Sequence, residues 1–103
     1  MIIKELVKTD GTNPFRNWFN SLNAQAAAKI AVAIDRIVLG NLSNIKWLGG
    51  IGEYRINWGP GYRIYLTKKG RNMIILLHGG IKKTQTSDIN YAKALYTFLK
   101  GNK

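Results

Sequence analysis

The stretch EYRINWGPGYRIYLT, residues 53–67, decides the fold of this chain. On each side of Gly59-Pro60-Gly61 polar and apolar residues alternate, which is the period of a half-buried β-strand. Glycine and proline between two such segments are typical of a chain reversal. We therefore predict an antiparallel hairpin in which Arg55 lies on the face away from the core, with Arg63 and Tyr65 sharing that open face.

The segment that follows the hairpin predicts one more strand and a last helix. Residues 68–72 are rich in turn formers, and residues 73–77 are apolar on both faces, as in a central strand. We expect Gly79-Gly80 to end this strand. A helix is then predicted to start near Thr86 or Ser87, because apolar residues recur from Ile89 onward at helical spacing.

The segment that precedes the hairpin predicts a strand and two helices. Residues 2–8 are β-branched and apolar, and turn formers follow them. Asn13 is a candidate N-cap with Pro14 at the first helical position, which predicts a short helix to about Leu22. A second helix is expected over residues 24–40, because its apolar residues recur at intervals of three and four.

Together these elements predict one α+β domain over residues 1–103. The expected order is β-α-α-β-β-β-α, with an antiparallel twisted sheet and an N-terminal helical hairpin packed on one face. A chain of this length can bury a core without disulfides or metals. The N-terminus carries charges too early for a secretory segment, and no apolar run is long enough to span a bilayer. We expect a cytoplasmic protein.

The composition is strongly basic, with 16 Lys and Arg against 5 Asp and Glu and a formal net charge of +11. No Asp or Glu occurs between Tyr54 and Gln85, although that segment holds several Lys and Arg. Such an excess favours a polyanionic partner, although it also fits a merely soluble basic surface. Without cysteine, and with 1 His, the chain has little from which to build a metal site, so we expect no metal and no cofactor.

The chain resembles the RelE/ParE superfamily of bacterial toxins, and within it the HigB-like killer proteins. The residues that carry the resemblance are Pro14-Phe15-x-x-Trp18, residues 34–37 before Gly40-Asn41, Arg55 in its strand, the turn of residues 59–65, and the spaced set from Leu76 to Ile89. The resemblance implies a RelE-like fold and a type II toxin that cleaves messenger RNA, usually on the ribosome. It also implies a cognate antitoxin, commonly a helix-turn-helix protein, through which the toxin reaches operator DNA.

Metal-free RNA cleavage needs cations on the phosphate, a base for the 2′-hydroxyl and an acid for the departing oxygen. Arg55 and Arg63 are the candidates for holding the phosphate, because a guanidinium offers a planar fork of donors. Lys82, with His78 or Tyr65, is the candidate for proton transfer. Further RNA contacts are predicted at Lys83, Gln85, Lys68, Lys69 and Arg71.

Two other functions fit the sequence. One is inhibition of DNA gyrase by a ParE-like protein, which needs no catalytic cations. The other is a non-catalytic basic module that binds nucleic acid as a co-repressor, with strongly salt-dependent affinity. The clustering of the cations on the predicted sheet and after its last strand, rather than on the helical hairpin, favours the nuclease.

Overall fold

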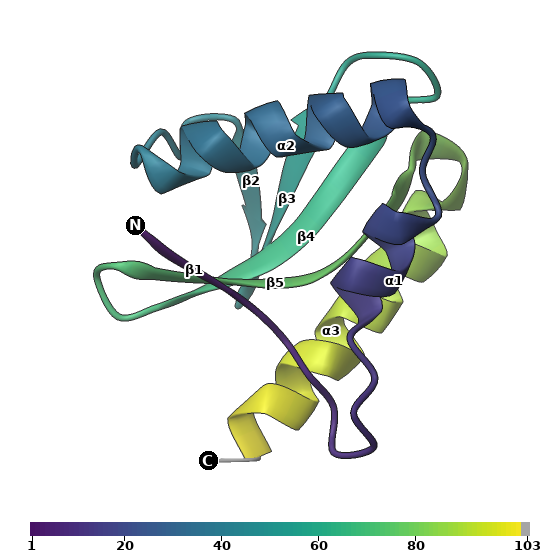
Figure 1. Cartoon of the computed structure of the whole chain (residues 1–103). Helices are drawn as coiled ribbons and strands as arrows, with labels where there is room; N and C mark the ends of the chain where they lie inside the picture. The colour runs from purple at the N-terminus through teal and green to yellow at the C-terminus, as the bar shows by residue number, and fades with distance from the viewer. Residues whose placement is uncertain (102–103) are drawn as a thin grey trace.

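The computed structural model describes residues 1–101, which form a five-stranded mixed sheet with helices on both faces (Figure 1). The strands are β1 (Ile2–Glu5), β2 (Ile45–Leu48), β3 (Ile51–Ile56), β4 (Tyr62–Lys69) and β5 (Met73–Ile81). The helices are α1 (Pro14–Asn20), α2 (Ala24–Val38), the short 3-10 helix η1 (Lys82–Thr84) and α3 (Gln85–Gly101). The α+β class is therefore correct.

The sheet differs from the prediction in two respects. Its order is β1-β5-β4-β3-β2, and β1 pairs with β5 in parallel, so the sheet is mixed rather than antiparallel. An additional strand, β2, precedes β3 and pairs with it. Four residues are too short to show a period, and the pairing of β1 with β5 joins segments about seventy residues apart, which local sequence does not encode.

Local sequence explains the first two helices. The Asn13 and Asn23 side chains accept hydrogen bonds from the backbone amides of Arg16 and Ala26, as N-caps do. Along α2 every third or fourth residue is buried, which turns one apolar stripe toward the sheet. In Figure 1, α2 lies across β2, β3 and β4.

Two hydrophobic clusters hold these layers together. The first lies between α1, α2 and one face of the sheet, and Phe15, Ile30 and Ile64 belong to it. The second lies between α3 and the opposite face, and Tyr65, Leu77 and Leu95 belong to it. The face that was predicted to be open is therefore covered in part by α3, and Tyr65 is buried there.

Gly79 and Gly80 do not end the last strand, because β5 continues to Ile81. They instead allow close packing on both faces. A Cβ at Gly79 would lie 2.3 Å from the ring of Trp18 in α1, and a Cβ at Gly80 would lie 1.8 Å from the carboxylate of Asp88 in α3. The two glycines thus let a helix approach each side of β5.

No helix within residues 1–101 combines the length and the apolar character needed to cross a membrane.

Candidate functional site

A pocket opens where β3 ends, β4 begins and the chain leaves β5. Its volume is about 260 Å³, and its polar lining includes Arg55, Arg63, Lys82 and Gln85. Arg55 and Arg63 lie directly opposite each other in the register of β3 and β4. Two like charges at opposed positions of a sheet repel each other, so an anion is needed near them.

The buried side chain of Glu53 supplies that anion, and its polar neighbours belong to the site. Glu53 is 0% exposed. Its carboxylate accepts hydrogen bonds from Arg55 Nε at 2.8 Å, from Gln85 Nε2 at 3.0 Å and from the Tyr65 hydroxyl at 3.2 Å. Arg63 Nε lies 3.7 Å from the same carboxylate, within ion-pair distance.

Glu53 was not among the site residues predicted from sequence. It stands one residue before the acid-free segment that begins at Tyr54, and strand alternation assigned it to an open face. The strand register could have identified Glu53 as a site residue. Glu53 lies opposite Tyr65 and two residues before Arg55, so all three side chains share a face of the sheet. The predicted excess of positive charge at this site is therefore partly neutralised.

The two arginines differ in their exposure to solvent. The Arg55 side chain is 44% exposed, whereas that of Arg63 is 8% exposed. Arg63 Nη1 donates to the carbonyl of Gly61 at 3.1 Å, and the buried Arg63 Nε has no hydrogen-bond partner among the described residues. Burying a guanidinium N–H group without a hydrogen-bond acceptor costs free energy. This position therefore favours a further anion in the pocket.

The environment fixes the charge state of the carboxylate and the phenol. Burial alone would raise the pKa of Glu53, but hydrogen bonds from Arg55 and Gln85 outweigh it and hold this pKa below its ordinary value. Burial and the adjacent Glu53 carboxylate raise the pKa of the Tyr65 phenol. Glu53 is therefore ionised at neutral pH, and Tyr65 stays protonated as its hydrogen-bond donor.

His78 and Tyr65 do not line the pocket, contrary to their predicted catalytic roles. His78 is 4% exposed and its Nε2 lies 2.8 Å from the carbonyl oxygen of Asp88. Its ring stacks on Tyr65 with centroids 4.9 Å apart. Burial lowers the pKa of His78. Both side chains belong to the layer beneath α3, where they support the pocket from behind.

The other predicted RNA contacts are divided between two places. Lys83 is exposed in η1 beside Lys82, while Gln85 lines the pocket. Lys68 and Lys69 are the last residues of β4, at the end of the strand opposite to the pocket, and Arg71 lies in the turn from β4 to β5. Five residues separate Arg63 from Lys68, which corresponds to about 17 Å along a strand. This turn is not part of the site.

Comparison with known proteins gives the family. Residues 17–97 match the family described as Phage derived protein Gp49-like (DUF891). The chain belongs to this Gp49-like family. It is also 45% identical over 86 residues to an uncharacterized protein of Haemophilus influenzae, covering 82% of this chain and 87% of that protein.

The family match corrects the assignment to the RelE/ParE superfamily and its HigB-like subgroup, because a different family model fits most of the chain. Packing accounts for part of the pattern that suggested the resemblance. Gly79 and Gly80 admit α1 and α3 to β5, and Asp88 accepts a hydrogen bond from Thr84 at the start of α3. These residues are explained by the fold, without reference to catalysis.

Proposed function

We propose that this Gp49-like protein is a cytoplasmic toxin of a type II toxin–antitoxin system, and that it cleaves messenger RNA without a metal ion. The observation that carries the proposal is the convergence of Arg55, Arg63 and Lys82 on one pocket of about 260 Å³. Arg55 and Arg63 pair with the one buried carboxylate of Glu53, and Lys82 adds a third cation to the pocket lining, which leaves a net positive site for a phosphodiester.

The chemistry is an internal transesterification of RNA. The ribose 2′-oxygen forms a bond to phosphorus while the bond from phosphorus to the 5′-oxygen breaks, which leaves a 2′,3′-cyclic phosphate and a 5′-hydroxyl. Arg55 and Arg63 stabilise the charge that develops on the phosphate oxygens. The Lys82 ammonium gives a proton to the departing 5′-oxygen.

The 2′-hydroxyl proton needs an acceptor. Lys82 acts as the acid in this proposal, and neither His78 nor Tyr65, the other two residues predicted to transfer protons, lines the pocket. We assign this proton to water or to a base of the ribosome. In this proposal the reaction depends on the ribosome, which would supply the missing group. We expect the antitoxin to inhibit by covering the basic pocket with an acidic segment.

The burial of His78 and Tyr65 also favours a second function, in which the protein binds nucleic acid as a co-repressor without cleaving it. Binding needs the cations but no proton acceptor, and the pocket meets that lower requirement. The two functions differ in whether RNA is cut.

The test is brief induction of the protein in bacteria, followed by mapping of messenger-RNA 5′ ends across the genome. The wild type is compared with Arg55→Ala and with Arg71→Ala as a control of equal charge. Because Arg55→Ala removes a donor to the buried Glu53 carboxylate, urea denaturation first checks that this variant is folded. We expect new 5′ ends with the wild type and Arg71→Ala, and none with Arg55→Ala. Intact messages with the wild type would contradict cleavage.

A further inference from the structure

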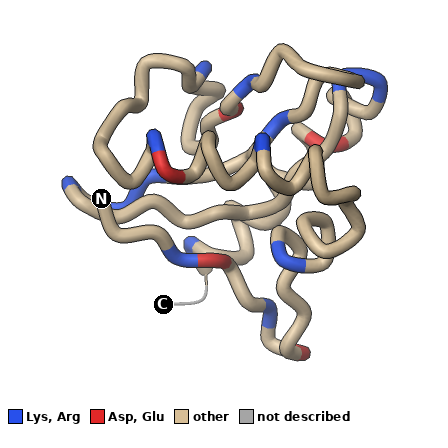
Figure 2. Tube along the Cα trace, turned by 45° about the horizontal axis from the view of Figure 1, so that its top comes forward, with Lys and Arg blue, Asp and Glu red and all other residues tan. Residues whose placement is uncertain are grey.

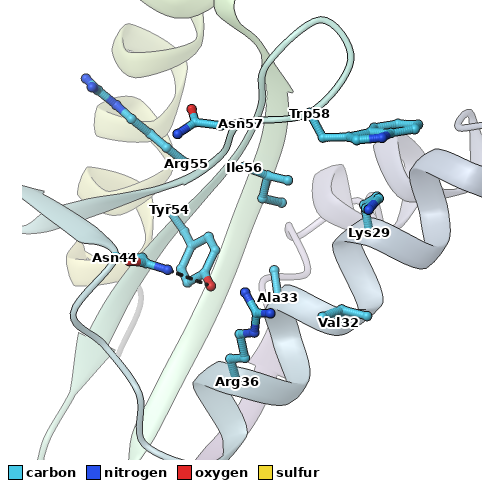
Figure 3. A pocket seen from close by; sticks show the side chains of 10 residues that line it. All are labelled: Lys29, Val32, Ala33, Arg36, Asn44, Tyr54, Arg55, Ile56, Asn57 and Trp58. Carbon is cyan, nitrogen blue, oxygen red and sulfur yellow. Dashed lines mark hydrogen bonds between the residues drawn. The ribbon is translucent and has the colours of Figure 1, made fainter.

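A second pocket lies on the other side of β3, between that strand and α2, and its volume is about 460 Å³ (Figure 3). This is within the usual size of small-ligand sites. Lys29 and Arg36 of α2 approach it from one side, and Tyr54 and Trp58 form its aromatic wall. The second pocket is distinct from the first pocket, which Arg63, Lys82 and Gln85 line.

The lining of the second pocket selects an anion with an aromatic part. Lys29, Arg36 and Arg55 are its charged residues, and no Asp or Glu lines it among the described residues. Lys29 Nζ lies 5.4 Å from the centroid of the Trp58 ring, a cation–π distance. The same indole stacks on Tyr62, with centroids 6.1 Å apart and planes 22° apart. The Trp58 ring therefore stacks on Tyr62 and has the Lys29 ammonium beside it.

The two pockets meet at the free end of β3. Arg55, Ile56 and Asn57 line both of them. The register of β2 ends with Ile45 opposite Tyr54, so β2 does not flank β3 beyond that point. A polymer strand can therefore pass over this edge from one face of the sheet to the other.

We infer that the second pocket binds a nucleotide of the same RNA strand whose neighbouring phosphate lies in the first pocket, beside Arg63 and Lys82. This inference rests on the proposed function. The base stacks on Trp58 in place of the Lys29 ammonium, because bases stack readily on aromatic side chains. Lys29, released from the ring, and Arg36 bind the flanking phosphates. Single-stranded RNA is the substrate class, since a duplex does not offer an unstacked base.

The test measures the affinity of two 2′-O-methyl RNA probes, a uridine dinucleotide and a uridine hexanucleotide, by fluorescence anisotropy. The methyl group prevents cleavage. The variants are Lys29→Ala with Arg36→Ala, and the matched double variant is Lys4→Ala with Lys93→Ala, which removes equal charge at positions outside both pockets. Alanine is well tolerated in a helix, so the changes in α2 should not disturb its fold.

We expect the double variant in α2 to bind the hexanucleotide about tenfold more weakly, and the dinucleotide as the wild type does. The slope of log affinity against log salt concentration should become shallower by about 0.7 for each phosphate that the variant no longer binds. The matched double variant should bind both probes nearly as the wild type does.

Three results would overturn the inference, and they separate it from the proposed function. An unchanged hexanucleotide affinity, together with a loss of affinity in Arg55→Ala, would overturn the second subsite and leave the proposed function standing. If the wild type bound neither probe at low salt, RNA binding itself would be refuted. A hexaglutamate peptide is the last probe: if the double variant in α2 bound this peptide more weakly but RNA unchanged, the second pocket would be a site for an acidic protein segment.

Discussion

Glu53 orients both arginines of the site, although it is a single buried carboxylate among many cations. Arg55, Gln85 and Tyr65 all donate to it, and Arg63 completes an ion pair with it. Removing one partner of a buried pair leaves an uncompensated charge, which costs far more than the loss of a surface pair. Glu53 therefore links the stability of the fold to the geometry of the pocket.

The first prediction is that Glu53→Gln lowers the free energy of unfolding by about 3 kcal/mol, because Arg63 is left buried without its counter-ion. Urea denaturation measures this change. The control is Glu5→Gln, which breaks the ion pair of Glu5 with Arg16, whose side chain is 46% exposed. That change should cost less than about 1 kcal/mol. Equal losses in the two variants would contradict the role given to Glu53.

The second prediction concerns pH and His78, the single histidine of the chain. Its folded pKa is below the ordinary value of 6.5, so the unfolded chain binds more protons as the pH falls through that range. The free energy of unfolding should therefore fall as the pH is lowered from about 7.5 to about 5.5. Because the pKa of Glu53 is also lowered in the folded protein, the free energy of unfolding should fall further as the pH is lowered below 4.5, the ordinary pKa of a glutamate. His78→Gln should flatten the upper part of the curve in denaturant titrations, and an unchanged slope there would count against a buried neutral His78.

At the scale of residues, the sequence predicted much of the pocket lining but not the buried side chains beneath it. Arg55, Arg63, Lys82 and Gln85 were all selected as site residues, and they line one pocket. The strand period places a residue on a face but does not say which face α3 will cover, so Tyr65 and Glu53 were placed on an open surface. His78 was selected for its titration range, which says nothing about burial.

Helix α3 decides which side chains of the sheet reach the pocket, and the close packing of helices on β5 depends on two glycines. Gly79 faces the ring of Trp18 and Gly80 faces Asp88, so each side of β5 can be approached by a helix. The stack of Tyr65 on His78 and the contact of His78 with the Asp88 carbonyl then connect α3 to β4 and β5.

The third prediction is that Gly79→Ala lowers the free energy of unfolding by about 2 to 3 kcal/mol, because the added methyl group collides with a rigid indole. The control is Gly101→Ala at the end of α3, where no atom lies within 4 Å of the added group. That variant should be neutral or slightly stabilising. Thermal and urea denaturation measure both, and a harmless Gly79→Ala would show that α1 does not pack as closely on β5 as described.

At the scale of elements, the hairpin of β3 and β4 and the helices α1, α2 and α3 could be predicted because their periods and caps lie in local sequence. Strand β2 could not, since four residues give no reliable period. The parallel pairing of β1 with β5 could not either, because the edge position of β1 results from packing of the whole chain.

The charge of the molecule is spread widely. In Figure 2, Lys and Arg occur along the whole trace and not in one region. Helices α1 and α2 carry some of them, among them Arg16, Lys29 and Arg36. The sheet and the segment after its last strand therefore do not hold all of the cations. We expect the net charge of +11 to favour polyanions in general, and the pockets at β3 to add local geometry for binding.

The fourth prediction separates these two contributions. Binding of single-stranded RNA should weaken steeply between about 50 and 200 mM salt, because contacts with phosphate release counterions. Arg55→Ala should reduce affinity more than Lys93→Ala, although both remove one charge, since Arg55 borders both pockets. Filter binding over a salt series measures this difference. Equal effects would indicate binding by net charge alone.

The most direct measurement of the central claim is cleavage of a defined messenger RNA on purified translating ribosomes, with identification of the new RNA ends. We expect cuts that carry a 2′,3′-cyclic phosphate and a 5′-hydroxyl, made by the wild type and by Arg71→Ala. Arg55→Ala and Arg63→Lys should make few or none while remaining folded, because lysine keeps the charge of arginine but not its fork of donors. Uncut messages with the wild type, or equal cutting by Arg55→Ala, would contradict the assignment of the pocket as a ribonuclease site.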